Sequence, residues 1–354
     1  MRGWSNGSNY DYIVANTAAA ETGNSNYGNP TSTGFTSNGV IGYNSSGIYM
    51  AIRAPMMKEP EAATDVFGMS NAMTQPLPAF NSTFPVDMSL NKRPAYGQNN
   101  AIGSRLQGTK HLYTDTTGAE VNEVEYVWDF MDGWGGFNSS NSDYQSWNWK
   151  RAKGYMDVVC YKGTGSARTQ AHSLGVVPEM MWVFNRAANY FHPVYHKALP
   201  ITQRLQGEDV DPAATQDMWN STSPTDSVLS VSSHPSVNAS NGNYIAYLFA
   251  TLAGISKCGS YTGNGSYQTI SCGFSAGSRF VLIKRTDASG DWFYWDSVRG
   301  IVAGNDPHLS LNTLSAQVTS DDSVDPHNSG FIVNQVSATN INVSSGTYIF
   351  YAIA

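Results

Sequence analysis

A segment of nearly 100 residues occurs at least twice in this chain, and the repeat limits the folds that are open to it. The matching segments are YKGTGS (161–166) and YTGNGS (261–266) at an offset of 100, PEMMWVFNR (178–186) and GSRFVLIKR (277–285) at an offset of 99, and the closing runs YIAYLFA (244–250) and YIFYAIA (348–354). We therefore predict two full repeat units, at 156–250 and 258–354.

Weaker copies precede these two units. PVDMSLNKR (85–93) has the same Pro-to-Arg spacing as 178–186, which indicates a degenerate unit over 63–152. The N-terminal region matches only the second part of a unit, so 1–55 is predicted to be a half unit. A period near 95 residues is too long for a solenoid turn or a propeller blade. It suits small, jelly-roll-like β-sandwich domains strung in tandem, joined by short linkers.

The stretch 258–300 supports an all-β fold. Asn264 and Gly265 tolerate the positive φ that a tight turn demands, so a hairpin is predicted around them. The apolar run 280–283 and the aromatic run 292–295 then read as two strands joined by a turn at 287–290. The chain is 13% charged and contains 33 Gly and 20 Tyr, a composition that is typical of turn-rich β proteins.

Two of the three cysteines lie symmetrically about Gly265. On a hairpin, Cys258 and Cys272 would be opposite partners on neighbouring strands. A disulfide and a pair of buried thiols both fit this spacing, and we favour buried thiols because nothing in the sequence indicates an oxidising compartment. The hairpin offers too few ligands for a zinc site.

Charge and hydropathy exclude several partners. The net charge is −7 and no stripe of Lys and Arg is present, which argues against nucleic-acid binding. The first residues lack the apolar core of a signal peptide, and the longest apolar runs are far too short to cross a bilayer. We therefore expect no nucleic acid among the partners and no membrane insertion.

One segment, GFSAG (273–277), formally fits the nucleophile elbow of α/β hydrolases. That motif needs a helix after the serine, whereas 280–283 reads as a strand, and the preceding unit lacks the serine. A plain turn is the favoured interpretation, and no catalytic residue is predicted.

Metal and cofactor sites are equally unsupported. His192 and His196 would share a face only on a helix, and Pro193 lies between them, so we expect surface or hydrogen-bonded histidines. The acidic loops 208–211 and 321–325 lack the glycine spacing of a known calcium loop. No phosphate-binding loop or dinucleotide motif is present. We predict no metal and no cofactor.

Aromatic residues are the remaining candidates for ligand contact. Flat rings offer platforms for the apolar faces of sugars, and the same residues also supply large packing areas in a core. The candidates are Trp292, Tyr294 and Trp295 in the last unit, and Trp182, Tyr190 and Tyr195 one unit earlier. Alternation along 292–295 places Trp292 and Tyr294 on one face and Phe293 and Trp295 on the other, so at least one face must be core. Packing is the favoured interpretation.

Several long segments resemble a repeated module in large virion proteins of marine tailed bacteriophages, including phages of cyanobacteria. They are YTGNGSYQTISCGFSAGSRFVLIKRTDASGDWFYWDSVRG (261–300), TYIFYAIA (347–354), EMMWVFNR (179–186) and IYMAIRAPMMKEPEAATDVF (48–67). These motifs are specific as family markers, but they carry no catalytic residues.

The resemblance implies a non-enzymatic structural protein of the virion, assembled in the host cytoplasm. A tail-associated fibre or adhesin that contacts a host-surface glycan is the main expectation. The alternatives are a capsid decoration protein and a polysaccharide-binding or polysaccharide-degrading tail protein. Other virion proteins are the expected partners. Because the half unit at 1–55 would expose strand edges, we also expect a homo-oligomer, for which a trimer is the usual solution in fibres.

Overall fold

The computed structural model describes residues 10–12, 22–25, 28–31, 34–37 and 58–354. The chain forms two compact units, which divide after Met56. In the first unit, β1 (Tyr10–Tyr12) pairs antiparallel with β2 (Thr22–Ser25), and β3 (Gly28–Thr31) pairs antiparallel with β4 (Gly34–Ser37). The predicted half repeat over 1–55 lies mostly outside the described residues.

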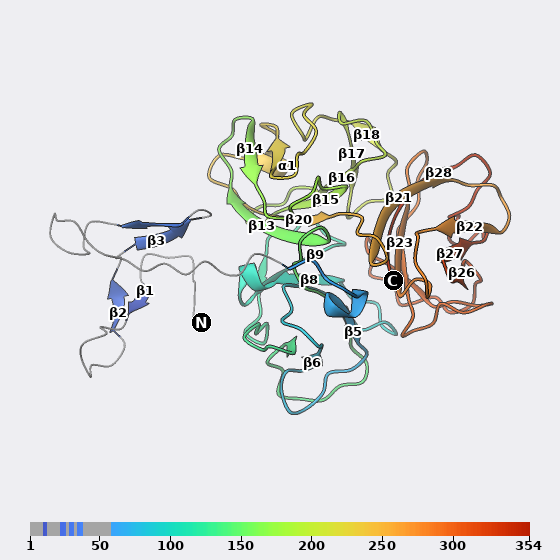
Figure 1. The fold of residues 1–354 in the computed structure, drawn as a ribbon, viewed down its shortest axis with the longest axis horizontal. Helices are drawn as coiled ribbons and strands as arrows, with labels where there is room; N and C mark the ends of the chain where they lie inside the picture. The colour runs from blue at the N-terminus through green and yellow to red at the C-terminus, as the bar shows by residue number, and fades with distance from the viewer. Residues whose placement is uncertain (1–9, 13–21, 26–27, 32–33, 38–57) are drawn as a thin grey trace. The chain divides into compact units, whose positions relative to one another are not determined.

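The second unit contains the three remaining repeats, and each builds one large and one small antiparallel sheet (Figure 1). The large sheet of the first repeat has the order β10-β9-β8-β7-β12-β5, and its small sheet pairs β11 with β6. The strands are β5 (Phe67–Ser70), β6 (Phe80–Asn81), β7 (Met88–Lys92), β8 (Ala101–Ser104), β9 (Lys110–Tyr113), β10 (Val121–Asn122), β11 (Gly133–Trp134) and β12 (Gln145–Trp149).

The second repeat has the large sheet β13-β20-β15-β16-β17-β18 and the small sheet β14-β19. Its strands are β13 (Met156–Lys162), β14 (Arg168–Ala171), β15 (Met180–Asn185), β16 (Pro193–His196), β17 (Gln203–Gln206), β18 (Ala214–Thr215), β19 (Val228–Val231) and β20 (Asn243–Phe249). The helical turns of the described residues are η1 (Ala63–Asp65) and η2 (Arg105–Gln107) in the first repeat and α1 (Pro235–Asn238) in the second.

The third repeat has the large sheet β21-β28-β23-β24-β25 and the small sheet β22-β27-β26. Its strands are β21 (Ser256–Thr262), β22 (Gln268–Ser271), β23 (Phe280–Arg285), β24 (Trp292–Asp296), β25 (His308–Ser310), β26 (Val324–His327), β27 (Gly330–Val333) and β28 (Thr347–Ile353). The prediction of an all-β fold is confirmed. The finer assignment of each repeat to a jelly-roll-like sandwich stays a prediction.

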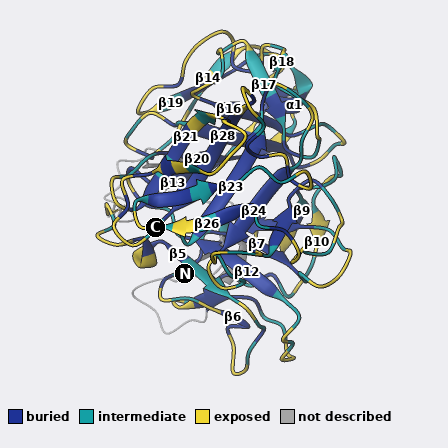
Figure 2. Cartoon of the chain, turned by 90° about the vertical axis from the view of Figure 1, so that its right-hand side faces the viewer, coloured by how far each residue is buried: buried dark blue, intermediate teal, exposed yellow. Residues whose placement is uncertain are grey.

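Each large sheet is buried on both faces, and Figure 2 shows its central strands in the colour of buried residues. One face packs against the small sheet of the same repeat, and the other joins a core that all three repeats share. On β15, for example, Met180 and Trp182 point into the shared core while Met181 and Val183 face the small sheet. Burial on both faces explains why the strands at 180–184 and 280–283 are continuous apolar runs rather than alternating ones.

The first repeat differs from the other two in the layer between its sheets. Where the other large sheets present apolar side chains, β7 and β12 present Ser89, Asn91, Ser146 and Asn148, all buried. Trp134 of the small sheet donates its Nε1 hydrogen to Ser146 Oγ (3.0 Å) and Asn148 Oδ1 (2.8 Å). Buried polar groups need such partners to avoid a desolvation cost, and this polar layer accounts for the weaker sequence match of the repeat.

The repeats close into a ring through main-chain hydrogen bonds between neighbours. Three of these bonds are Glu120 N to Arg186 O (3.0 Å), Ala213 N to Thr286 O (2.9 Å) and Gln317 N to Pro94 O (2.7 Å). They join the first repeat to the second, the second to the third and the third back to the first. Residues 58–354 therefore form one compact unit, in which neighbouring repeats lie against each other around one shared core.

These closing bonds occupy equivalent positions in the three repeats. Leu112, Leu205 and Leu309 each pair with the strand before them, opposite Ile102, Val194 and Tyr294. Each donor of a closing bond lies eight residues after its leucine, as the residue numbers show. The ring thus has approximate threefold symmetry within a single chain.

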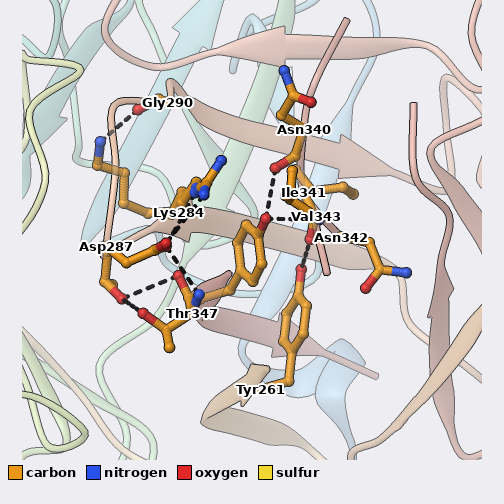
Figure 3. Close-up of polar contacts among 12 residues, drawn as sticks. Tyr261, Lys284, Asp287, Gly290, Asn340, Ile341, Asn342, Val343 and Thr347 are labelled. Carbon is orange, nitrogen blue, oxygen red and sulfur yellow. Dashed lines mark hydrogen bonds and ion pairs between the residues drawn. The ribbon is translucent and has the colours of Figure 1, made fainter. Parts of the chain in front are cut away.

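Two buried lysines strengthen the ring at matching positions of β7 and β23. Lys92 donates to the carbonyl of Thr313 in the neighbouring repeat (3.3 Å). Lys284 donates to the carbonyl of Val210 in its neighbour (2.8 Å) and to that of Gly290 (Figure 3). Burial lowers the pKa of each lysine to about 8. Backbone carbonyls satisfy the donors, so that both ammonium groups are tolerated in the interior.

The structure corrects the alignment of the repeats by one residue. Met180 of β15 pairs with Phe249, and Phe280 of β23 pairs with Ile353. Because 249 and 353 are equivalent ends of the closing strands, Met180 corresponds to Phe280, and the offset is 100 rather than 99. In the first repeat Met88 pairs with Trp149, which makes Met88, not Asp87, the equivalent of Met180. A slip of one residue exchanges the two faces of a strand, so the predicted register was wrong.

The predicted hairpin around Gly265 is also wrong. Gly265 does adopt a positive φ of 77°, as its turn chemistry requires. However, β21 pairs with β28 in the large sheet, while β22 pairs with β27 in the small sheet. The turn therefore carries the chain from one sheet to the other. The later hairpin is confirmed, because β23 and β24 pair antiparallel.

Because β21 and β22 belong to different sheets, Cys258 and Cys272 do not lie opposite each other. Cys258 lies in the shared core and Cys272 in the cluster between the sheets of the third repeat. Both are free and buried, so the expectation of two buried thiols is confirmed.

Candidate binding groove

Five of the six aromatic candidates for ligand contact are buried. Trp182, Trp292 and Tyr294 lie in the shared core, Tyr195 and Trp295 lie in the clusters of their own repeats, and Tyr190 is half-buried. The rings of Trp182 and Trp292 stack across the contact between the second and third repeats, with centroids 6.3 Å apart. Trp292 also donates its Nε1 hydrogen to the carbonyl of Gln206 (2.7 Å). Three of the buried rings pack between the repeats and two pack within a repeat, so none of the five is available to a glycan at the surface.

The formal nucleophile motif, 273–277, forms a loop between β22 and β23. No helix follows Ser275, because the chain continues into strand β23. Main-chain bonds from Phe274 N to Ser329 O (3.2 Å) and from Gly277 N to Asn328 O (2.8 Å) tie the loop to the turn after β26. This arrangement is the plain turn that was favoured from the sequence.

His192 and His196 are both buried, so of the expected surface or hydrogen-bonded histidines, His196 fits the hydrogen-bonded alternative and the ring of His192 fits neither. His196 accepts a hydrogen bond from the amide of Ala198 at Nδ1 (3.2 Å). The ring nitrogens of His192 have no hydrogen-bond partner in the described part of the chain, and its Nδ1 lies 3.7 Å from Glu208 Oε2. Burial lowers the pKa of His192 to about 3 and that of His196 to about 4, so both rings are neutral at neutral pH.

The two acidic loops do not gather into a metal site. Glu208 accepts the amide of His192 (2.9 Å), and Asp209 accepts the side-chain amide of Gln206 (2.9 Å). In the other loop, Asp321 accepts the hydroxyl of Ser323 (2.8 Å). Within residues 58–354 and the short described strands before them, no group of three or more His, Cys, Asp or Glu residues is placed to hold a metal ion.

A surface groove of about 420 Å³ lies where the second repeat meets the third. It runs between β21 and β22, which are the edge strands of the large and the small sheet. Because these two strands diverge after the turn at Gly265, the space between them is open on one side. The groove is lined by Lys197, Lys257, Cys258, Gly259, Ser260, Tyr261, Gln268, Thr269, Ile270, Ser271 and Phe350.

Gly259 shapes the floor of this groove. A Cβ atom at this position would overlap the ring of Phe350, so only glycine lets the ring lie against β21. The equivalent pair in the second repeat is Val159 and Ala246, in which the large and small residues are exchanged. The floor of the groove is therefore apolar, made by Phe350 and Ile270.

Tyr261 forms one wall, and its position is fixed by two contacts. Its hydroxyl donates to the carbonyl of Ile341 (2.6 Å), as Figure 3 shows. Its ring stacks on Tyr348, with centroids 4.9 Å apart and planes inclined by 14°. The wall is rigid before any ligand arrives.

The groove was missed from the sequence because an edge-strand groove depends on which side chains are absent. A signal was available in the comparison of the repeats. At an offset of 100, Val159 becomes Gly259, Arg168 becomes Gln268 and Asp157 becomes Lys257. Loss of bulk and reversal of charge at aligned positions indicate a local difference in surface chemistry.

Comparison with known proteins places these features in one family. The model of a domain family of unknown function, DUF7483, matches residues 81–354, which is more than three quarters of the chain. No curated protein and no solved structure matches. Among the described residues, none of the helices has the length and apolar character needed to cross a membrane.

Proposed function

The chain belongs to the DUF7483 family, a domain family of unknown function, and we propose that it is a structural protein of a tailed-bacteriophage virion. In this proposal it is a tail-associated component of fibre or adhesin type that contacts the host surface. The resemblance of its repeats to modules of phage virion proteins supplies the biological setting.

The closed ring of three repeats is the observation that carries the proposal. Three buried charged side chains are used for contacts inside the molecule. Lys92, Lys284 and Arg186 each donate a hydrogen bond to a group of a neighbouring repeat. Such a body is stiff, because every repeat is held by two neighbours and by the shared core. Stiffness and a large, well-packed β interior suit a particle component that must survive outside a cell.

The groove between β21 and β22 gives the proposed host contact a place on this rigid body. It is formed by strands rather than by a long loop, so its walls are positioned by the sheets. Assembly with other virion proteins and formation of a homo-oligomer stay predictions that accompany the proposal.

The position of the chain in the particle tests the proposal. Gold-labelled antibodies raised against residues 58–354 should bind at the tail of intact particles, and the same antibodies should reduce adsorption to host cells. Labelling over the head would contradict the tail assignment and favour a capsid decoration protein. Release of reducing sugar ends from host polysaccharide by the purified chain would instead favour a degrading tail enzyme.

A further inference from the structure

We infer that the groove between β21 and β22 is a binding site for an acidic saccharide, with the anionic group of the sugar at Lys257. This inference rests on the proposed function and deepens it, because it names the chemistry of the host contact. It uses residues different from the six aromatic candidates, all but one of which are buried.

In the second repeat, an arginine side chain lies at the position that is equivalent to this groove. There, Arg168 donates to the carbonyl of Lys162 (3.0 Å) and to Gln170 Oε1 (3.0 Å), and its guanidinium lies 5.4 Å from the centre of the Tyr161 ring. The arginine thus crosses the space between the two edge strands and occupies it.

In the third repeat that crossing is missing. Gln268 donates to the carbonyl of Thr262 (3.1 Å), as Arg168 does to that of Lys162. The glutamine side chain is, however, shorter than that of arginine. Ile270 replaces Gln170 and offers no acceptor. The Oε1 atom of Gln268 is buried and has no hydrogen-bond partner among the described residues, so a hydroxyl donor from a ligand would satisfy it.

The charge at the base of the groove is reversed between the repeats. Asp157 is fully buried and used internally, since it accepts the amide of Ser173 (2.7 Å) and pairs with Arg151 (2.6 Å). Its equivalent, Lys257, is half-buried in the groove and forms no ion pair within the part of the chain that the structure describes. Lys197, the other cation of the groove, already pairs with Glu179 (2.8 Å). Lys257 is therefore the cation left for an anionic ligand.

The remaining lining fits a sugar ring better than an apolar molecule. Ser260, Thr269 and Ser271 carry exposed hydroxyl groups along the two rims, while the floor of Phe350 and Ile270 is small and apolar. Sites for small molecules combine an apolar surface with a few placed polar groups in volumes of roughly 300–1,000 Å³.

The test is a glycan array probed with the full-length chain. The array should hold carboxylated, phosphorylated and neutral oligosaccharides of bacterial surfaces, and titration calorimetry should follow on the member that binds most strongly. We expect an acidic member to bind at least tenfold more tightly than its neutral counterpart, and an increase in salt from 50 to 500 mM to weaken that binding. The carboxylated and phosphorylated members distinguish the two sources of negative charge.

Three variants assign the binding to the groove. Gln268→Arg places the arginine of the second repeat in the groove and should abolish binding, and Lys257→Ala should weaken it at least tenfold. Arg168→Gln, the matched change in the second repeat, should leave binding unchanged. Equal thermal midpoints for Gln268→Arg and the wild type would show that the loss is not caused by unfolding.

Two results would overturn the inference: no acidic oligosaccharide binds, or binding survives both Gln268→Arg and Lys257→Ala. Either result is independent of particle labelling. A chain found at the tail that binds no acidic glycan would refute the inference alone, whereas a chain absent from the tail that binds through this groove would refute the proposed function alone.

Discussion

Glu120 and Arg186 are joined twice, once through the backbone and once through their side chains. The amide of Glu120 donates to the carbonyl of Arg186 at 3.0 Å, and Arg186 Nε lies 2.7 Å from Glu120 Oε2. The two side chains are only 11% and 7% exposed. The equivalent main-chain bonds at Ala213 and Gln317 involve no such ion pair, because neither residue is charged. The contact between the first and second repeats is therefore the one of the three closing contacts that is reinforced by an ion pair between the two bonded residues.

Replacement of Glu120 by alanine is predicted to lower the free energy of unfolding by about 3 kcal/mol. Removal of one partner leaves the Arg186 guanidinium buried without its counter-charge, which costs far more than the loss of an exposed pair. Urea unfolding followed by tryptophan fluorescence measures the change. Lys58→Ala is the matched control, since the Lys58–Glu61 pair is 81% and 79% exposed and should contribute less than about 0.5 kcal/mol. Equal effects of the two substitutions would contradict a buried contact between the repeats.

Asn100 makes the contact between the first and third repeats. Its side-chain nitrogen lies within hydrogen-bond distance of the carbonyls of Ser310, Leu311 and Thr313, at 3.0–3.2 Å. Asn100→Ala removes these hydrogen bonds from a buried contact, although Lys92 still donates to Thr313 and Thr114 to Leu311, and it should destabilise the chain by about 1–3 kcal/mol. Asn99→Ala is the control, because Asn99 is half-buried and binds only Asp115 within its own repeat. A thermal midpoint that falls no further for Asn100→Ala than for Asn99→Ala would show that this contact is not formed.

Gly265 supplies the positive φ at which the chain passes from the large to the small sheet of the third repeat. Gly265→Val should destabilise the chain by about 1–3 kcal/mol, because a β-branched residue resists this backbone conformation. Space is not the obstacle, since a Cβ atom would lie 3.4 Å from its nearest neighbour, Ser344 Cβ. Gly265→Asn tolerates positive φ and should retain most of the stability. Similar losses for valine and asparagine would show that φ is not the cause.

Buried His192 makes stability depend on acid. Its pKa is lowered to about 3 in the folded state, against an ordinary value of 6.5, so between these pH values the unfolded chain binds a proton that the folded chain does not. Stability therefore falls as the pH drops from about 6.5 toward 3, by up to roughly 1 kcal/mol per pH unit.

His192→Asn introduces the residue that the first repeat has at the equivalent position, Asn100, and should reduce this slope. Burial raises the pKa of the neighbouring Glu208 and acts in the opposite direction, so the comparison is between variant and wild type at the same pH. Urea midpoints that change equally with pH in the two proteins would contradict the account.

Much of the fold follows from local sequence patterns. Turn residues and β-branched or aromatic runs predicted an all-β chain, and the similar closing runs at 244–250 and 348–354 predicted the repeats. The hairpin at Gly265 failed because Asn-Gly chemistry specifies the turn but does not specify which strand lies beside the next one. The register failed because a shift of one residue at β23 is invisible when both faces of a strand are apolar, whereas the structure keeps the offset at 100.

The ring closure and the groove depend on contacts between residues far apart in the sequence. The unbroken apolar run at 180–184 carries a signal of burial on both faces, and thus of a second packing partner for the sheet, which the prediction did not use. The identity of that partner was not readable, because the closing bonds use main-chain groups that every residue possesses. The six aromatic residues were ambiguous for the same reason, since a ring looks alike in a core and on a surface.

Native-state hydrogen exchange of three amides tests the closed ring most directly. The amides of Glu120, Ala213 and Gln317 each close one contact between repeats. If the repeats form one cooperative body, these amides open only on global unfolding, so their opening free energies should agree with one another and fall with the same slope in denaturant. Three different free energies, each with its own shallow slope, would show that the repeats open independently and would contradict the ring.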